Sequence, residues 1–162
     1  EGIIAALYEA SAAGVEIELI VRGICCLKVG IPGISENIHV RSIVGNFLEH
    51  SRIFFFLNDG EEELYMGSAD WMPRNLDRRV EILFPVLDDT LKEKVKHILD
   101  VELADNTKAH VLKPDGEYEK IDRRGKVLVN SQKQFCEEAV AAVPKTDHVY
   151  RERVFVPAEP AE

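Results

Sequence analysis

The sequence predicts an α/β (α+β) fold in which a mixed sheet is flanked by helices. Three observations support this class. A helical segment, a glycine turn and an apolar strand follow one another within residues 3–21. Two further strand-like segments are separated by a tight turn, and amphipathic helical segments follow the later strands. Elements that succeed one another in this way bury their apolar faces by packing in layers.

The first elements are marked by periodicity and by glycine. Residues 3–13 place apolar side chains on one helical face, and Gly14 stands where a left-handed C-cap is expected. Residues 15–21 alternate and then become apolar, which is typical of a strand entering a core. Residues 22–42 contain glycines and a proline that impose repeated turns, so we expect a long loop. Loops of that length in compact domains are often functional.

A hairpin is expected next. The strands are residues 53–58 and 63–69, and the turn is Asn58-Asp59-Gly60, a sequence that favours the backbone of a hairpin connection. Residues 79–86 are expected to form another, buried strand because they are mostly apolar. If the two hairpin strands pair around this turn, the residues just before the first strand lie beside those just after the second.

The C-terminal half is expected to be more helical. A helix over 90–104 begins after Asp88-Asp89, since aspartate is a preferred N-cap. A short hairpin follows within 108–129, and a last helix covers 131–142. The small, acidic tail at 158–162 is expected to fray.

Composition limits the class of protein. A chain of 162 residues corresponds to about one domain, so we treat residues 1–162 as a single domain. The formal net charge of −9 argues against a nucleic-acid binder, which is usually basic. Every apolar run is far shorter than the ~20 residues that span a bilayer. Three cysteines without a CxxC spacing favour a reduced, cytoplasmic protein, and the absence of an initiator Met suggests a piece of a longer chain.

Residues suited to phosphate chemistry surround the predicted hairpin. His50 precedes its first strand, Ser68 and Asp70 follow its second, and Arg22 ends the first strand of the chain. An imidazole that titrates near neutral pH can attack phosphorus or donate a proton. Guanidinium groups match phosphoryl oxygens and stabilise their charge. The expected site comprises these residues together with others nearby in the sequence: Arg52, Arg74 and Asn75.

Each of these residues also has a structural interpretation. A histidine beside an apolar strand is often part of the scaffold, and arginines such as Arg74, Arg78 and Arg79 can form a solvated rim. Trp71 is assigned to packing. No HExxH, paired CxxC or DxDxDG spacing marks a metal site, and no residue is predicted as a metal ligand. The GxGxxG and GxxxxGKS phosphate loops are also absent from the sequence.

Long, ordered motifs then indicate a family. The sequence motifs are Tyr8–Ser11, Ala13–Val15, Leu19–Leu27, Gly30–Gly33, Ser35–Ile38, Ser42–Gly45, Phe47–Ile53 and Gly67–Glu81. Over residues 1–87 the sequence resembles the C-terminal part of polyphosphate kinases of the first family, and the likeness is looser over 88–162. The sequence departs from the family pattern at two positions. Asn46 stands where an arginine is usual, which removes one cation, and Val29 stands where a proline is common.

The resemblance implies the last domain of a longer, four-domain chain, with a fold like one half of phospholipase D. The His-x-Arg and Gly-Ser-Ala-Asp patterns, with the later Asn75 and Glu81, resemble a phospholipase D half-site. In this chain Arg52 replaces the lysine of that half-site and Asp70 replaces its asparagine. Leu57 occupies the spacing of a downstream aspartate in that pattern. A phospholipase D-like phosphodiesterase is therefore a weaker alternative.

The resemblance also implies an activity. The terminal phosphate of ATP is transferred reversibly to polyphosphate through a phosphohistidine that lies outside this chain. His50 is then the facing, catalytic histidine, and Arg22 holds nucleotide phosphates. Mg²⁺ is expected with ATP, with its main contacts outside the chain. The expected partners are ATP or ADP, polyphosphate, the preceding domains and other subunits of a homo-oligomer. The chain alone is expected to be inactive, and a non-catalytic phosphate-binding or assembly module is the other alternative.

Overall fold

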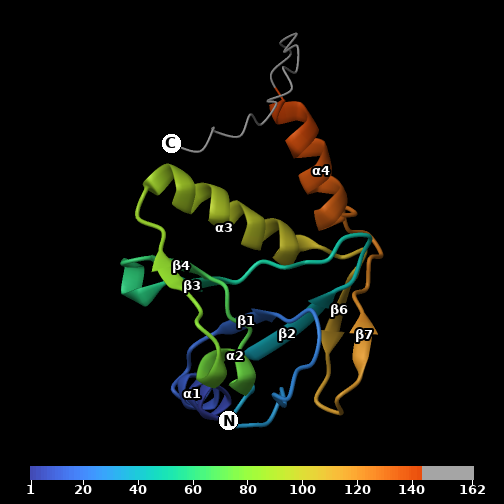
Figure 1. The fold of residues 1–162 in the computed structure, drawn as a ribbon. Helices are drawn as coiled ribbons and strands as arrows, with labels where there is room; N and C mark the ends of the chain where they lie inside the picture. The colour runs from blue at the N-terminus through green and yellow to red at the C-terminus, as the bar shows by residue number, and fades with distance from the viewer. Residues whose placement is uncertain (144–162) are drawn as a thin grey trace, which may run out of the picture.

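Two sheets form the framework of the protein, seen in a computed structural model that describes residues 1–143 (Figure 1). The four-stranded sheet has the order β1-β2-β6-β7, and the three-stranded sheet has the order β3-β4-β5. The elements are α1 (Gly2–Ala12), β1 (Ile17–Ile20), β2 (Ile38–Ile43), β3 (Ile53–Phe56), β4 (Glu63–Gly67), α2 (Pro73–Arg78), β5 (Leu83–Pro85), α3 (Asp89–Ala104), β6 (Ala109–Leu112), β7 (Tyr118–Lys120) and α4 (Ser131–Ala142). The mixed α/β class is confirmed.

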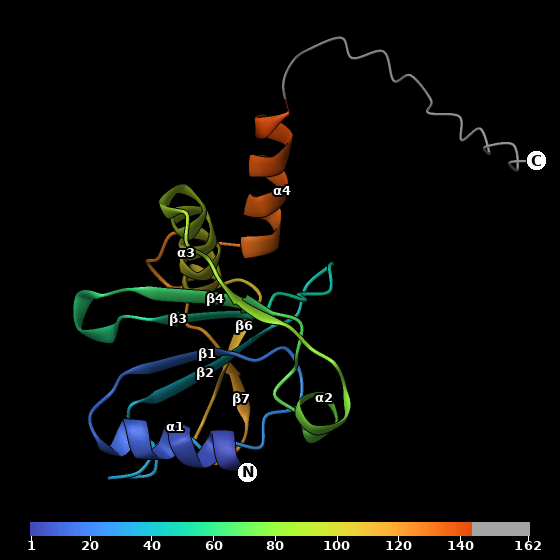
Figure 2. The same ribbon diagram turned by 60° about the vertical axis from the view of Figure 1, so that its left-hand side comes forward.

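The four-stranded sheet contains the first core. β1 and β2 are parallel, and β2 is antiparallel to β6, so the sheet is mixed. Helix α1 lies along this sheet (Figure 2) because its apolar face packs on the core cluster. That cluster comprises Leu27, Val29, Ile38, Val40 and Leu112. The expected helix, glycine turn and strand at the start of the chain are therefore confirmed.

The prediction of a loop over residues 22–42 is wrong at the C-terminal end of that range. Ile38–Ile43 forms β2, an inner strand that is paired on both sides. Ile38 and Val40 alternate with polar residues and point into the core, where they are 2% and 1% exposed. The alternation was visible in the sequence, but the glycines and proline that precede it belong only to the loop.

The three-stranded sheet is an antiparallel hairpin with a third strand added. Phe54 pairs with Tyr65 in the register of β3 and β4. The connecting turn uses left-handed backbone at Asn58 (φ 45°) and Asp59 (φ 54°), which short polar side chains tolerate. Helix α3 covers one face of this sheet through a cluster of Leu64, Val86 and Val95 with Ile53 and Met66.

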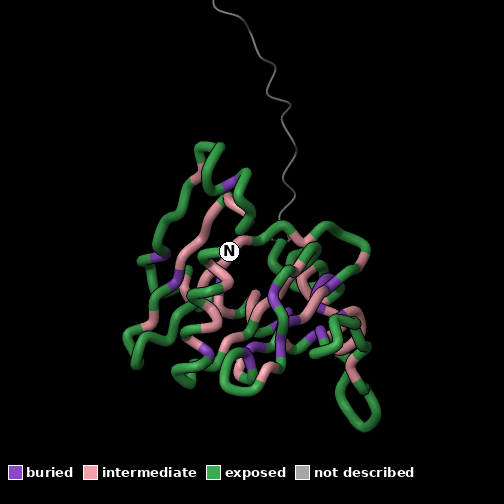
Figure 3. Tube along the Cα trace, turned by 90° about the horizontal axis from the view of Figure 1, so that it is seen from below, coloured by how far each residue is buried: buried purple, intermediate pink, exposed green. Residues whose placement is uncertain are grey.

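The strand expected over residues 79–86 is shorter and less buried than predicted. Only Leu83–Pro85 pairs, as β5 at an edge of the described sheet. Its residues are exposed, so the expectation of a buried strand is wrong. Residues 79–82 form no strand, although the Ile82 carbonyl still accepts the Ser68 N–H at 3.0 Å. Buried residues elsewhere form short stretches between exposed ones along the chain (Figure 3).

Helices α3 and α4 follow the predicted boundaries closely. The Asp88 carboxylate caps α3 by accepting the Leu91 N–H at 2.9 Å. Helix α4 extends away from the two sheets (Figure 2) and contacts α3 through His97 and Glu138, whose Nε2 and Oε2 atoms are 3.0 Å apart. Among residues 1–143 no helix has the length and apolar character needed to cross a bilayer. The predicted tail at 158–162 lies outside the described residues.

Candidate phosphate-binding site

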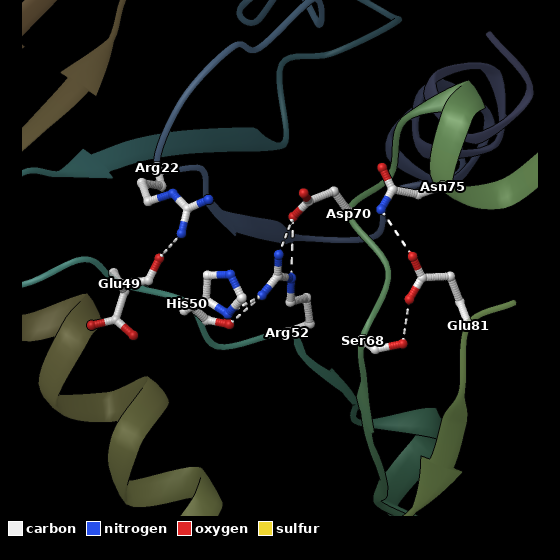
Figure 4. A network of polar contacts seen from close by, with 8 residues as sticks. All are labelled: Arg22, Glu49, His50, Arg52, Ser68, Asp70, Asn75 and Glu81. Carbon is white, nitrogen blue, oxygen red and sulfur yellow. Dashed lines mark hydrogen bonds and ion pairs between the residues drawn. The ribbon is translucent and has the colours of Figure 1, made fainter. Parts of the chain in front are cut away.

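One cavity of about 400 Å³ collects residues from both sheets and from α2 (Figure 4). All seven residues predicted from the sequence line it: Arg22, His50, Arg52, Ser68, Asp70, Arg74 and Asn75. The cavity also includes Arg79, Val80 and Glu81. Arg22 follows β1, His50 and Arg52 precede β3, and Ser68 and Asp70 follow β4. Most of the predicted site residues therefore lie next to the ends of strands.

The hairpin register brings the segment that carries His50 next to the segment that carries Ser68. Ile53 is opposite Met66, and the Gly67 N–H donates to the Arg52 carbonyl at 3.0 Å. The chain therefore passes His50 and Ser68 at the same end of the hairpin, as expected from the turn. A shift of this register by one residue would turn the side chains of the shifted strand to the other face of the sheet.

Arg52 is the central contact of the site. Its Nε and Nη2 atoms donate to Asp70 Oδ1 at 3.1 and 2.7 Å. Its Nη1 atom contacts the His50 carbonyl at 2.6 Å and His50 Nδ1 at 2.5 Å. A guanidinium can only donate, so His50 Nδ1 must accept. The imidazole is then neutral with its proton on Nε2, which leaves Nε2–H available to an anion in the cavity.

Arg22 approaches from the other side of the histidine (Figure 4). Its Nη1 atom donates to the Glu49 carbonyl, which fixes one edge of the guanidinium. Its remaining N–H donors have no protein acceptor among the described residues, and Arg22 is exposed. A guanidinium held by one edge is suited to bind a phosphoryl group with the other.

Glu81 organises the far wall of the cavity. Its carboxylate accepts hydrogen bonds from Ser68 Oγ and from Asn75 Nδ2, the latter at 3.0 Å. These bonds from Ser68 and Asn75, with Arg79 and Arg52 nearby, lower the pKa of Glu81, so it is ionised at neutral pH. Ser68 Oγ also accepts the Ile82 N–H at 3.0 Å. Ser68 and Asn75 are consequently fixed in place by protein contacts.

Arg79 and Glu81 line the cavity but are not among the seven predicted site residues, although Glu81 belongs to the pattern that resembles a phospholipase D half-site. Both fall in the segment predicted as a buried strand, where they occupy alternate positions. Two charged residues at positions i and i+2 of a strand share one face, which is a signal against burial on that face. Helix α2 was also missed, since six residues give too little periodicity.

Helix α2 nevertheless holds part of the site. Pro73 occupies its first turn, where the missing N–H costs nothing. The preceding Trp71 stacks on Phe54 of β3 with ring centroids 5.2 Å apart, so the packing role predicted for Trp71 is confirmed. Asn75 is 2% exposed and its Oδ1 atom has no partner within the described part of the chain. Arg74 is exposed at the cavity.

The local charge of the cavity is opposite to that of the whole chain. Four guanidinium groups face two carboxylates in its lining, although the chain carries a formal charge of −9. Local positive potential of this kind concentrates anions. Asn46, the position at which an arginine is missing, does not line the cavity. The loss of that cation therefore leaves the described lining unchanged.

The same residues do not fit a metal ion. Asp70 accepts from Arg52, and both oxygens of Glu81 accept from neighbouring side chains. No group of three or more histidine, cysteine, aspartate or glutamate side chains within residues 1–143 could hold one. The cavity is therefore suited to anions rather than to a cation held by the protein.

Comparison with known proteins decides the family. The family model described as polyphosphate kinase C-terminal domain 2 matches residues 1–132. The chain belongs to the polyphosphate kinase family. A polyphosphate kinase from Lactiplantibacillus plantarum is 53% identical over 146 residues, which is 90% of this chain and 20% of that protein. One from Pseudomonas aeruginosa is 56% identical over 142 residues, or 87% and 21%.

Two further relatives support the assignment. Polyphosphate kinase 1 from Chlorobaculum tepidum is 59% identical over 132 residues, covering 82% of this chain and 19% of that protein. The crystal structure of polyphosphate kinase from Porphyromonas gingivalis matches with a TM-score of 0.82 and 43% identity, covering 87% of this chain and 22% of that chain. The chain thus spans about a fifth of the length of its polyphosphate kinase relatives.

Proposed function

We propose that this chain supplies the phosphate-binding half of the active site of a polyphosphate kinase. The enzyme transfers the terminal phosphate of ATP reversibly to polyphosphate, and residues 1–162 form its last domain. The single observation that carries this proposal is the cavity in which Arg22, His50 and the other predicted residues converge with excess positive charge. Membership of the polyphosphate kinase family supports the choice of reaction.

The contacts suggest a division of roles. Arg22 and Arg74 have free guanidinium edges at the cavity and bind phosphoryl oxygens of the nucleotide or of the polymer. His50 faces a phosphohistidine carried by a preceding domain, and its neutral Nε2–H donates a hydrogen bond to an oxygen of the transferred phosphoryl group. Arg52 and Asp70 hold the imidazole in the required tautomer. Ser68 and Asn75, fixed by Glu81, complete the wall against which the phosphate rests.

Cofactor and partners follow from the reaction. Mg²⁺ would accompany ATP, and since the residues of this cavity do not fit a metal, its protein contacts would come from other domains. ATP or ADP, polyphosphate, the preceding domains and other subunits of a homo-oligomer are the proposed partners, and nucleic acid is not one of them. The unpaired cysteines Cys25, Cys26 and Cys136 are compatible with a cytoplasmic enzyme.

The central test is His50→Ala in the full-length kinase. Removal of one hydrogen-bond donor to developing negative charge typically lowers kcat by about 10²–10³-fold, so polyphosphate synthesis should fall by about that factor. The matched control is His39→Ala, which removes an exposed histidine of β2 that is 3.6 Å from Glu16 and does not line the cavity. A rate for His50→Ala equal to that of the control variant would rule out the catalytic role.

A non-catalytic phosphate-binding or assembly module is the second candidate, because the proposed phosphohistidine is not in this chain. It predicts that His50→Ala weakens binding of short polyphosphate without a separate loss of turnover at saturation. A phospholipase D-like phosphodiesterase predicts hydrolysis of phosphodiesters by the full-length protein. The Arg52–Asp70 pair stands where that chemistry would need lysine and asparagine, and we expect no hydrolysis.

A further inference from the structure

The acidic pair Glu49 and Glu102 does not belong to the lining of the cavity. Glu102 of α3 is only 3% exposed, and its Oε1 atom has no hydrogen-bond partner among residues 1–143. Its carboxyl group is in hydrogen-bonding contact with that of Glu49. In Figure 4 the Glu49 carboxylate points away from the cavity toward α3, while the Glu49 carbonyl faces Arg22. Glu49 therefore connects the buried pair to the site.

Within residues 1–143 no cation forms an ion pair with Glu102. The charges that act on it are those of Glu49 and Asp105, and both are negative. Asp105 is fully buried, but its oxygens accept several N–H and O–H bonds and it remains ionised. The guanidinium of Arg41 is engaged with a backbone carbonyl and with Glu18. Burial, then Glu49 and Asp105, raise the pKa of Glu102 to about 8.

We propose that Glu102 and Glu49 share one proton, and that this pair positions the Glu49–His50 segment so that Arg22 and His50 face the same cavity. Two carboxylates in contact, one of them buried, cannot both be ionised without a large penalty. The neutral Glu102 hydroxyl donates to the Glu49 carboxylate, which also accepts from Ser51 Oγ at 2.8 Å. Glu102 is thus a positioning residue, since it contacts Glu49 and not the cavity.

Loss of the shared proton should disturb the site. Two facing carboxylates repel, and the only one of the pair that can move into solvent is Glu49, which is half-buried in a loop. Its carbonyl would then release Arg22, and the adjacent His50 would shift from Arg52. This consequence for the site rests on the proposed function. The existence of the shared proton does not depend on it.

The first experiment measures the proton directly in the full-length kinase. The infrared difference spectrum, in which the spectrum of Glu102→Gln is subtracted from that of wild type, should show the carbonyl band of a protonated carboxyl group at pH 7. That band should disappear with a midpoint near pH 8. Glu93→Gln, which removes an exposed carboxylate from the same helix, should leave the band in place. Absence of the band from wild type, or its persistence in Glu102→Gln, would overturn the shared proton whatever the enzyme catalyses.

The second experiment measures positioning through the pH profile. For wild type and Glu93→Gln, kcat/KM for polyphosphate synthesis should fall severalfold between pH 7 and pH 9. Glu102→Gln keeps a donor for Glu49 and cannot ionise, so its profile should lack this fall. Glu102→Leu, which has no donor, should be reduced at every pH. Superimposable profiles for wild type and Glu102→Gln would overturn the positioning role even if the proton is present. Absence of synthesis in wild type would instead contradict the proposed function.

Discussion

At the scale of single residues, the site is a chain of charge-assisted contacts. Asp70 holds Arg52, and Arg52 holds His50 by both its carbonyl and its Nδ1 atom. The side chains of Arg52 and Asp70 are 13% and 32% exposed, so water screens this pair less than a surface pair. The tautomer and orientation of His50 therefore depend on a residue with which it has no direct contact.

Asp70→Ala tests this dependence. It should leave Arg52 without its anion and free to turn, so His50 loses its fixed tautomer. Hydrogen bonds to charged groups contribute about 1.5–3 kcal/mol, which corresponds to roughly a 10–150-fold fall in kcat. Steady-state kinetics of the full-length enzyme measure the effect. Asp77→Ala is the control, because Asp77 is exposed on α2 and does not line the cavity. Equal kinetics for the two variants would contradict the proposed chain of contacts.

Arg22→Ala separates binding from chemistry. Removal of one charged phosphate contact costs about 1.5–3 kcal/mol, so KM for ATP or polyphosphate should rise roughly 10–150-fold. Arg22→Lys should recover only part of this, since an ammonium cannot bind two oxygens in the same planar arrangement. Arg124→Ala is a suitable comparison, as Arg124 is exposed and paired with Asp122. Wild-type kinetics at limiting ATP in Arg22→Ala would exclude the assigned contact.

At the scale of elements, one buried aspartate connects α3, β6 and α4. Asp105 follows α3, its Oδ1 accepts the N–H groups of Thr107, Lys108 and Ala109, and its Oδ2 accepts the N–H and hydroxyl of Ser131. Burial would raise the pKa of Asp105, but the bonds from Lys108 and Ser131 outweigh it and lower the pKa. The end of α3, the start of β6 and the start of α4 are consequently fixed to one another.

Asp105→Ala should loosen this junction. Each donor left buried without a partner costs about 1–3 kcal/mol, so the melting temperature should fall and the Lys108 and Ala109 amides should exchange hydrogen faster. Mass spectrometric hydrogen exchange on the full-length protein measures the second effect locally. Asp115→Ala removes an exposed turn aspartate that accepts one N–H from Glu117 and should change little. Unaltered exchange in Asp105→Ala would contradict the structural role.

At the scale of the whole molecule, the free energy of unfolding should depend on pH through Glu102. The unfolded side chain has a pKa near 4.5 and the folded one about 8, so between these values the folded protein binds a proton that the unfolded chain has lost. Stability from this group is complete below about pH 4.5 and declines as pH rises toward 8.

Glu102→Gln should remove that contribution. Differential scanning calorimetry of wild type and Glu102→Gln at pH 6, 7, 8 and 9 measures it as the difference in melting temperature at each pH. The difference should shift in favour of the variant as pH rises to about 8 and then remain constant, because the glutamine has no proton to lose. Parallel curves across the range would show that Glu102 is not protonated in the folded state.

Sequence alone determined the local elements and the identity of the chemical groups. Glycine after the first helix, aspartate before α3 and the Asn58-Asp59-Gly60 turn each specify a backbone conformation locally, so these boundaries were predictable. Tertiary structure alone decided that Ile38–Ile43 lies between two strands and that Leu83–Pro85 is at an edge, since pairing depends on residues distant in the chain. It also brought Glu81 to Ser68 and Glu102 to Glu49. Burial and long-range contact are properties of the packed molecule, because the free energy of a charge depends on what surrounds it.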